Sequence, residues 1–217
     1  RLSDGAIIIP QYHYHYSFLT ELQMYGYPYV MYNPWVQLDP RHSVISMDAE
    51  AEQEMTSYLI THGRSNIAII NGPRDHVDAQ SRFEGYRNAL TEAGRAVRED
   101  LVRWSDFTMH GGYTTTLALL DSASVRPEAI VCGNDYLAVG AIHALHDQGL
   151  AVPDDIAVTG FGDHDVGRSV IPRLTTMAIP SRNIGKALGD KLFSQISPTG
   201  DDQQTVFRHK LHRYESA

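Results

Sequence analysis

A stretch in the second half of the chain, residues 126–176, has the pattern of two strands with a helix between them. Residues 129–132 form a short apolar run bounded by a glycine and, two residues before it, a proline, as expected of a buried strand. Apolar residues at helical spacing follow and stop at Gly149, which suits the left-handed end of a helix. A second apolar run covers residues 156–161. Such a unit pairs its strands in parallel through a right-handed crossover, so the stretch predicts an α/β fold.

The rest of the chain continues this alternation. Apolar runs predict further strands over residues 6–9, 29–32, 44–47, 66–71, 101–104, 174–177 and 206–212. Helical spacing predicts helices over residues 18–25, 48–62, 82–93, 112–120 and 181–196. Glu50, Glu52 and Glu54 fall in the early turns of the second of these helices, where we expect a solvated face.

The composition is that of a globular protein with a net negative charge. Of the 217 residues, 42% are hydrophobic and 20% are charged, and the formal net charge is −8. Direct binding of nucleic acid usually requires a basic surface, so we do not expect it of this chain. No apolar run approaches the roughly 20 residues that span a bilayer, and we expect no membrane contact. The chain begins at Arg1 rather than methionine, so we expect a fragment, and the absence of a signal peptide is weak evidence.

Cys132 is the single cysteine of the chain. One cysteine excludes an internal disulfide and fits a reducing compartment. Because Cys132 lies within an apolar run, a small core residue is a better interpretation than a nucleophile.

Several longer segments carry a resemblance to a known family. They are GYPYVMYN, SVISMDAEAEQEMTSYLITHGRSNIAIINGP, RFEGYRNALTEAG, SDFTMHGGY, NDYLAVGAIHALHDQGLAVPDDIAVTGFGD, IPRLTT and the terminal HRYESA. In this order they resemble the lactose-repressor/galactose-repressor (LacI/GalR) family of bacterial transcription regulators, which sense sugars or nucleobases. The resemblance covers nearly the whole chain.

The resemblance implies a periplasmic-binding-protein-like type I fold. This is an α/β fold with two Rossmann-like lobes, each on a parallel sheet, joined by three crossings with the effector between them. It assigns residues 1–38 and 179–198 to an N-terminal lobe, and residues 39–178 and 199–217 to a C-terminal lobe. The N-terminal lobe would lack its first strands and helices, and the DNA-binding helix-turn-helix would be absent. An incomplete sheet exposes an edge, so we expect that the natural chain is longer or that this lobe is disordered or rearranged.

Two candidate ligand contacts follow strands of the N-terminal lobe, where the carboxyl ends of parallel strands form a ligand-binding crevice. Tyr12 belongs to the aromatic segment 11–16, which could stack on a sugar ring or could be a loop that covers the crevice or meets another chain. Asn33 stands where the resemblance implies a polar effector contact, although it could simply form a turn before Pro34. His13 and His15 lack a third ligand nearby, so we predict no metal site.

Arg82 and Phe107 are candidates in the C-terminal lobe. Arg82 lies off the apolar stripe of its predicted helix, near the helix N-terminus, where the helix dipole does not favour a cation. In the resembling family the arginine of this RxxGY context clamps ligand hydroxyls or a carboxylate, which suits the planar guanidinium. The alternative is a surface salt bridge with Glu84 or Asp78. Phe107 resembles the aromatic residue of the cleft wall, although it could equally belong to the core.

Asn134, Asp135 and Asp163 complete the predicted effector contacts. Asn134 and Asp135 follow a strand and can cap the next helix. The resemblance adds that the side chain at this position faces the effector. The family usually carries an aspartate where this chain has Gly162, and Asp163 comes one residue later. A shift by one residue on an extended segment turns the side chain the other way, so either the loop is remodelled or the contact is absent.

These observations predict a binding protein rather than an enzyme. We expect the effector-sensing and dimerisation region of a cytoplasmic transcription regulator, with no cofactor, a sugar-like effector, and operator DNA bound only through the absent segment. By resemblance Val139, Val170 and Ile171 are candidates for the homodimer interface, or else simple core residues. A periplasmic sugar-binding protein of a transport system is the main alternative. An α/β enzyme is disfavoured because GxSxG, GxxxxGK[ST] and a GxGxxG after a strand are all missing, and His143 and His146 indicate a polar helix face.

Overall fold

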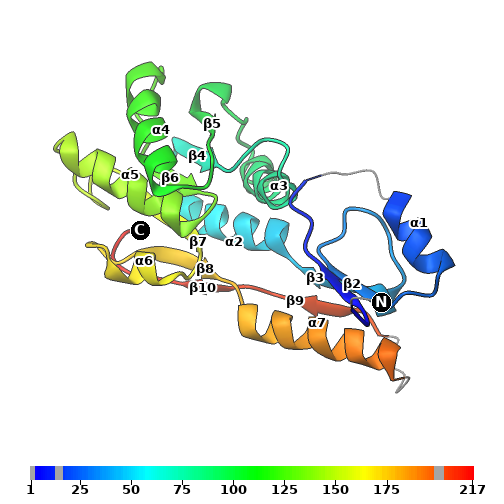
Figure 1. The fold of residues 1–217 in the computed structure, drawn as a ribbon. Helices are drawn as coiled ribbons and strands as arrows, with labels where there is room; N and C mark the ends of the chain where they lie inside the picture. The colour runs from blue at the N-terminus through cyan, green and yellow to red at the C-terminus, as the bar shows by residue number, and fades with distance from the viewer. Residues whose placement is uncertain (1–2, 13–16, 198–202) are drawn as a thin grey trace. The chain divides into compact units, whose positions relative to one another are not determined.

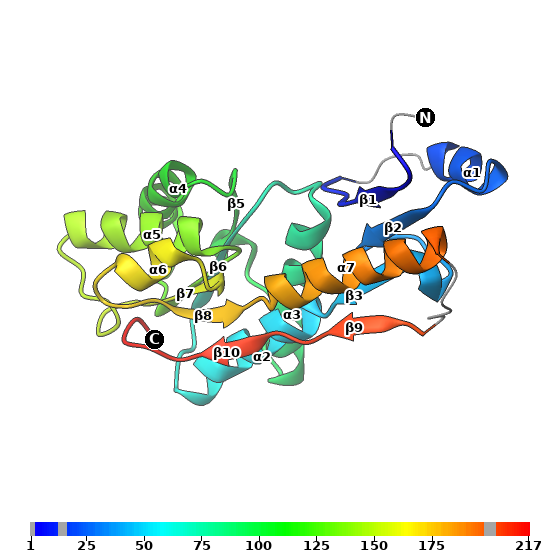
Figure 2. The same ribbon diagram turned by 60° about the horizontal axis from the view of Figure 1, so that its bottom comes forward.

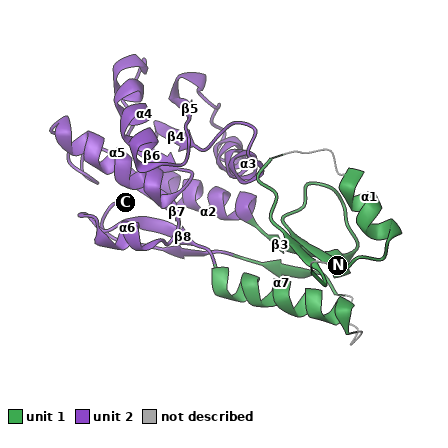
Figure 3. Ribbon diagram, viewed as in Figure 1, with its two compact units in different colours: residues 1–47, 180–208 green, residues 48–179, 209–217 purple. Residues whose placement is uncertain are grey.

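The computed structural model describes residues 3–12, 17–197 and 203–217. The chain forms two compact units (Figure 3). Unit 1 comprises Arg1–Met47 and Pro180–Arg208, and unit 2 comprises Asp48–Ile179 and His209–Ala217. The chain therefore passes three times from one unit to the other, as the family resemblance implies.

Unit 1 is built on a parallel sheet of four strands in the order β1-β2-β3-β9. Its elements are β1 (Ala6–Ile8), α1 (Ser17–Met24), β2 (Tyr29–Tyr32), the 3-10 helix η1 (Pro40–His42), β3 (Ser43–Ser46), α7 (Ser181–Ile196) and β9 (Thr205–Phe207). Helix α7 packs along β1, β2 and β3 (Figure 2). Leu19 of α1 is buried against Tyr29 and Met31 of β2, which forms a small core.

Unit 2 is built on a six-stranded sheet in the order β10-β8-β7-β6-β4-β5. Its strands are β4 (Ile67–Asn71), β5 (Val102–Trp104), β6 (Ala129–Cys132), β7 (Ala157–Gly162), β8 (Thr175–Ala178) and β10 (Lys210–His212). All neighbours pair in parallel except β10, which runs antiparallel to β8 at the edge. The carboxyl ends of the five parallel strands therefore lie along one edge of the sheet, here called the carboxyl edge.

Helices cover both faces of this sheet (Figure 1). They are α2 (Asp48–Thr61), α3 (Val77–Glu92), α4 (Met109–Ser122), α5 (Asp135–Asp147) and the short α6 (Asp165–Ser169), with the 3-10 helix η2 (Glu99–Leu101). Successive side chains of a strand point to opposite faces, so β4 contributes Ile70 to the core with α4 and α5 and Ile69 to the core with α2 and α3. Both faces of β4 and β6 are buried, which explains why β6 and all of β4 before Asn71 are apolar.

The unit boundaries correct the lobe boundaries predicted from the sequence. Strands β3 and β9 fall in unit 1, whereas the prediction placed residues 39–47 and 203–208 in the C-terminal lobe. The reason is strand pairing, because β3 pairs with β2 and β9 pairs with β3. The apolar run 206–212 was predicted to be one edge strand, but it divides into β9 and β10 at the passage after Arg208.

Two further features differ from the prediction in unit 2. Helix α3 begins at Val77, five residues before Arg82, and His76 caps it by accepting the backbone N–H of Asp78 through Nδ1 at 3.2 Å. Arg82 therefore lies in the second turn rather than at the helix start. Helix α6 had no signal in the sequence pattern. None of the helices in the described residues is long and apolar enough to cross a membrane.

Candidate functional site

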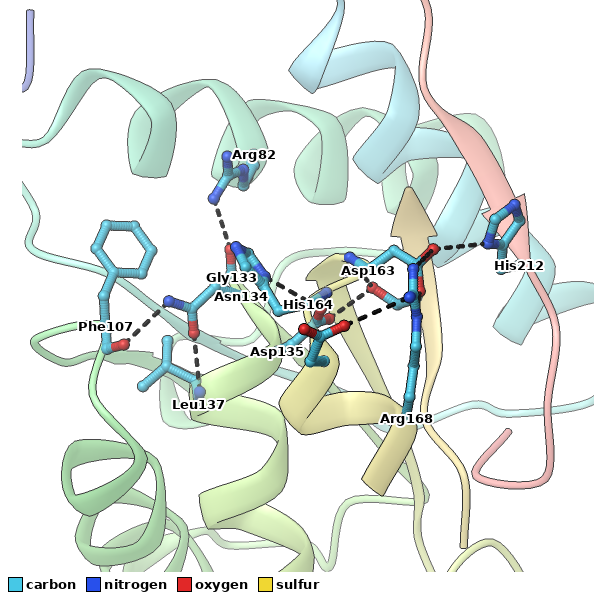
Figure 4. Close-up of polar contacts among 12 residues, drawn as sticks. Arg82, Phe107, Gly133, Asn134, Asp135, Leu137, Asp163, His164, Arg168 and His212 are labelled. Carbon is cyan, nitrogen blue, oxygen red and sulfur yellow. Dashed lines mark hydrogen bonds and ion pairs between the residues drawn. The ribbon is translucent and has the colours of Figure 1, made fainter. Parts of the chain in front are cut away.

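The candidate site in unit 2 lies at the carboxyl edge of the sheet, where Asn134 follows β6. Asn134 caps α5, because its Oδ1 accepts the backbone N–H of Leu137 at 2.8 Å. Its Nδ2 donates to the backbone carbonyl of Phe107 at 3.0 Å (Figure 4). Asn134 is thus a helix cap, as predicted, and it also ties the loop after β5 to the end of β6.

Asp135 is fully buried beside this cap. Its carboxylate accepts hydrogen bonds from the Thr176 hydroxyl at 2.6 Å and from the backbone N–H of His164 at 2.5 Å. Nδ1 of the His164 ring lies 3.2 Å from the same carboxylate. A Cβ on Gly160 would lie 2.4 Å from Oδ1 of Asp135, so only glycine permits this approach. The carboxylate therefore joins the segments that follow β6 and β7 to Thr176 within β8.

Arg82 is buried, with 8% of its side chain exposed. Of the two salt-bridge partners considered from the sequence, Asp78 lies 3.7 Å from Nη2 of Arg82, so the pair exists but the arginine is not on the surface. Its Nε and Nη2 donate to Oδ2 of Asp48 at 3.1 and 2.9 Å, and its Nη1 donates to the Gly133 carbonyl at 2.6 Å. The guanidinium lies 4.0 Å from the ring centroid of Phe161. Burial opposes the charge, but the Asp48 and Asp78 carboxylates outweigh it and raise the pKa of Arg82. Arg82 is therefore a permanent cation at the end of β6.

Asp48 connects Arg82 to two further buried titratable groups. Its Oδ1 lies 2.8 Å from Nε2 of His209, whose side chain is fully buried. Glu52 lies one turn further along α2, and burial raises its pKa to about 8. Among the described residues, Nδ1 of His209 and Oε2 of Glu52 have no hydrogen-bond partner. Asp48 and His209 are the first residues of unit 2 after two of the three chain passages, so this buried group of polar side chains starts where the chain enters the unit.

Glu52 corrects the prediction of a solvated glutamate face on α2. Glu50 and Glu54 are exposed as expected, but Glu52 has no exposed surface. The sequence held a signal for this, because Glu52 lies beside Ala51 and one turn before Met55 on the buried stripe of the helix. Asp48 precedes Glu52 by four residues and shares that stripe.

Phe107 follows β5 and is half-buried, and its contact with a ligand stays a prediction. Its ring lies over the backbone of Gly72, where a Cβ would be 2.0 Å from the ring. It also packs on the core cluster beneath α4 and α5, and meets His76 edge-on at 5.1 Å between centroids. Its backbone adopts a positive φ of 63°, which is uncommon for a non-glycine residue and turns the ring toward the carboxyl edge.

Asp163 follows Gly162 at the end of β7. Its carboxylate accepts from Arg168 at 3.2 and 2.9 Å, and lies 3.2 Å from Nδ1 of His212 on β10 (Figure 4). Partial burial opposes ionisation, but Arg168 and His212 outweigh it and lower the pKa of Asp163. Asp163 has a positive φ of 58° after Gly162, so the segment is a turn rather than extended backbone, and the prediction that Asp163 contacts the ligand stays a prediction.

The remaining predicted ligand contacts lie in unit 1. Asn33 follows β2 with a φ of 43°, accepts the backbone N–H of Ser46 at 2.7 Å and donates to the Ser46 hydroxyl at 2.9 Å. Asn33 therefore links the end of β2 to β3. It lies in a turn, which is the alternative role considered from the sequence. Tyr12 is half-buried after β1. His13 and His15 lie outside the described residues, and the described residues contain no group of three metal-ligating side chains.

The three residues predicted for a dimer interface differ in exposure. Val139 of α5 is 2% exposed and Val170 is half-buried against the α5 core, whereas Ile171 is 92% exposed. Cys132 is buried in the core, and burial raises its pKa well above the usual range, in agreement with a packing role. His143 and His146 are exposed on α5, as expected of a polar helix face.

Comparisons with known proteins agree on one family. Residues 56–216 match the model of a family described as a periplasmic binding protein-like domain. The chain is 33% identical over 194 residues to the probable HTH-type transcriptional repressor ExuR of Bacillus subtilis (strain 168), covering 89% of this chain and 58% of that protein. It is 38% identical over 151 residues to the ribose operon repressor of Escherichia coli (strain K12), covering 70% of this chain and 46% of that protein.

A solved structure gives the same result. The sugar-binding transcriptional regulator (LacI family) from Escherichia coli, complexed with phosphate, matches with a TM-score of 0.91 at 26% identity, covering 99% of this chain and 77% of that chain. The chain spans about half the length of the curated relatives it matches.

Proposed function

The chain belongs to the LacI/GalR family of transcription regulators and corresponds to its effector-binding region. We propose that it binds a small sugar-like ligand and that this binding changes the DNA affinity of the repressor of which it is part. The relatives named above are repressors, which favours a regulator over a transport protein and over an enzyme. DNA would be bound by a segment outside this chain. A repressor of this kind acts on DNA inside the cell, so the proposal includes a cytoplasmic location.

One observation carries the proposal, namely the arginine that the carboxyl edge holds in place. The three hydrogen bonds of Arg82 to Asp48 and Gly133 use three of the five guanidinium N–H groups. Of the two that remain, the one on Nη2 belongs to the nitrogen 3.7 Å from Asp78, and the one on Nη1 is left for a ligand oxygen. Phe107 supplies an aromatic face nearby, and its carbonyl fixes Asn134. Ligands of α/β proteins bind beyond the carboxyl ends of parallel strands, which is where these residues gather.

The regulatory step follows from linkage. A ligand shifts an equilibrium between two conformations only by its difference in affinity for them. Arg82 is bonded to Asp48, and Asp48 is bonded to His209, so the cation at the site is connected to two residues at which the chain enters unit 2. We propose that ligand contact with Arg82 acts on these two residues first.

The test is calorimetric titration of the full-length natural chain with sugars, sugar acids, sugar phosphates and nucleobases. We expect one class of compound to bind. We expect its affinity to fall at least tenfold in Arg82→Lys, because lysine keeps the positive charge but lacks the planar guanidinium with its several N–H donors. Arg87→Ala is the matched control, because Arg87 lies on the same helix and is exposed beside Glu84. Circular dichroism checks that both variants fold. Equal binding to Arg82→Lys would place the site elsewhere, and no binding by any compound would overturn the proposal.

We also propose that the regulator is a homodimer and that Ile171 contributes to its interface. A side chain of this size that is 92% exposed favours burial against a partner. We expect Ile171→Glu to convert a dimer into a monomer in sedimentation velocity. The control is Tyr25→Glu in unit 1, at a residue 74% exposed. A dimer that survives Ile171→Glu would remove this residue from the interface.

A further inference from the structure

A histidine ring occupies the space beside the carboxyl end of β7. Gly162 ends this strand with a φ of 129°, and a Cβ placed on it would lie 2.1 Å from Cε1 and 2.3 Å from Nδ1 of His164. No side chain can therefore replace the hydrogen of Gly162 while His164 keeps its position. The imidazole of His164, two residues after Gly162, therefore takes the place of a side chain at this position.

The imidazole is held in one orientation. Its Nδ1 lies 3.2 Å from the Asp135 carboxylate, which also accepts the backbone N–H of His164. That carboxylate is fully buried and is fixed in turn by Thr176. The ring lies beside Tyr136 at 5.5 Å between centroids, and 45% of the His164 side chain is exposed. Because Nδ1 faces the buried carboxylate, Nε2 faces outward, and no protein atom in the described part of the chain bonds to it.

The charges around this ring favour its protonated form. The hydrogen bond to Asp135 raises the pKa of His164, assisted by Asp163, against partial burial and the positive charge of Arg82. Protonation gives Nε2 a hydrogen, so the outward nitrogen is a charged donor rather than an acceptor.

The carboxylates of the carboxyl edge are already bound by donors of the protein itself. Asp48 accepts from Arg82 and from His209, Asp135 from His164 and Thr176, and Asp163 from Arg168 and His212. Among the charged side chains described at this edge, Arg82 and His164 are the ones with an N–H group left for a ligand. A neutral sugar presents hydroxyl groups that need acceptors as well as donors, whereas an anionic group needs donors alone.

We propose that His164 is a specificity-determining residue whose Nε2 binds an anionic oxygen of the effector, so that the effector is an acidic sugar derivative rather than a neutral sugar. The inference rests on the proposed function, since it assumes that the carboxyl edge is the effector site. A carboxylate and a phosphate ester share the chemistry that the donors require. The two sources are distinguished by the compounds in the test.

The experiment is calorimetric titration of the full-length natural chain with matched compounds. These are D-glucose and D-galactose, the uronate of each and the 6-phosphate of each. We expect one acid to bind at least tenfold more tightly than its neutral parent, and whether it is the uronate or the phosphate identifies the anion. We expect the affinity for that acid to fall as the pH rises through the pKa of His164, while the affinity for the neutral parent stays constant.

Two variants separate the contribution of the hydrogen bond between Nδ1 of His164 and Asp135 from that of the outward donor Nε2. In His164→Asn the amide nitrogen falls near the place of Nδ1, so the bond to Asp135 can persist while the outward donor is lost. In His164→Gln the amide nitrogen reaches the place of Nε2. We expect His164→Asn to lose the preference for the acid and its pH dependence, and His164→Gln to keep a larger part of the preference at all pH values. His146→Asn is the control, because His146 is an exposed histidine, 88% of its side chain exposed, on α5.

The outcomes distinguish the inference from the function on which it rests. If a neutral sugar binds as tightly as its acid and His164→Asn leaves both affinities unchanged, His164 is not a specificity residue, although the effector function stands. If an acid is preferred equally by wild type and His164→Asn, the anion binds elsewhere and the inference fails. If no compound binds the natural chain, both the inference and the proposed function are overturned.

Discussion

Each unit buries one cation among the described residues, and the two cations have different surroundings. Arg82 in unit 2 is paired with the Asp48 carboxylate at the carboxyl edge of the sheet. Lys191 in unit 1, which is 2% exposed, donates to the backbone carbonyls of Pro40 at 3.1 Å and of Gln203 at 2.7 Å. Lys191 thus holds α7 to η1 and to the segment before β9. Burial of a charge does not itself mark a binding site, and the position of Arg82 at a strand end with an N–H group to spare sets it apart.

The two units also differ in how completely their apolar residues are buried. Every residue of β4 and β6 in unit 2 is buried. In unit 1, Ile7 and Ile9 at the outer strand are 47% and 62% exposed, and Phe193 of α7 is 71% exposed. Burial of apolar surface contributes roughly 25 cal/mol per Å², so unit 2 has the larger share of the stabilisation. The exposed edge at β1 agrees with the expectation that this sheet presents unburied apolar surface.

Replacing each buried cation by methionine compares the units directly. Arg82→Met leaves Asp48 buried without its guanidinium, and we expect a loss of about 3–5 kcal/mol from the free energy of unfolding of unit 2. Lys191→Met leaves two carbonyls unbonded, and we expect a loss of about 1–3 kcal/mol from unit 1. Urea unfolding measures both, because Trp104 reports on unit 2 and Trp35 on unit 1 once the other tryptophan is replaced by phenylalanine. A larger loss for Lys191→Met would reverse the comparison.

The next largest loss of unfolding free energy is expected from truncating one isoleucine in each unit. Ile130 of β6 has no exposed surface, so Ile130→Ala creates a cavity and should cost about 3 kcal/mol. Ile7 of β1 is half exposed, and Ile7→Ala should cost less than about 1 kcal/mol. The same two fluorescence probes apply. Equal losses would mean that unit 1 is as closely packed around its outer strand as unit 2 is around its centre.

The sequence predicted more of unit 2 than of unit 1, for physical reasons. The strand–helix–strand unit that contains β6, α5 and β7 was evident because its signals are local: apolar runs, a cap and a glycine stop. The lobe boundaries were wrong because β3 and β9 join unit 1 by pairing with distant strands, which no local pattern records. The division of the run 206–212 has the same origin.

The candidate site was predicted in part. Arg82 was found through its motif, and the cap at Asn134 through its position after a strand. The partners that give Arg82 its role, Asp48 and His209, lie 34 and 127 residues away and were not predicted. His164 was missed because its importance follows from its proximity to Gly162 and Asp135, which depends on a turn rather than on any period in the sequence.

Glu52 predicts a dependence on pH that belongs to unit 2. Burial raises its pKa to about 8, above the value near 4.3 of an unfolded chain. Between these values the folded state holds a proton that the unfolded state has lost, so the stability of unit 2 falls as the pH rises. The slope is at most about 1.4 kcal/mol per pH unit, and we expect Glu52→Gln to remove about 2 kcal/mol of the decline between pH 6 and 8. The measurement is urea unfolding with the Trp104 probe.

Two comparisons make the Glu52 result specific. Glu54→Gln changes an exposed residue of the same helix and should leave the slope unchanged. The Trp35 probe of unit 1 should not report the slope. A decline that persists in Glu52→Gln would assign the titration to another group of unit 2.

Asp163 gives the smallest effect and bears on the limits of the site. Partial burial opposes its ionisation, but Arg168 and His212 lower its pKa, so the contact stabilises unit 2 above the unfolded pKa and is lost as the pH falls through the folded pKa. Arg168 is half exposed, and screening by solvent limits the contribution. We expect Asp163→Asn to cost less than about 1 kcal/mol at pH 7, and the cost to shrink as the pH falls through the folded pKa of Asp163.

The same variant tests the predicted ligand contact of Asp163, with Asp165→Asn as the control because Asp165 is 98% exposed and touches the same arginine at 3.4 Å. If Asp163 binds the effector, its replacement lowers the affinity measured by calorimetry while the control does not. If the affinity is unchanged, Asp163 serves only to hold β10 against the turn that follows β7. The effector would then meet only the side of the carboxyl edge that carries Arg82 and His164.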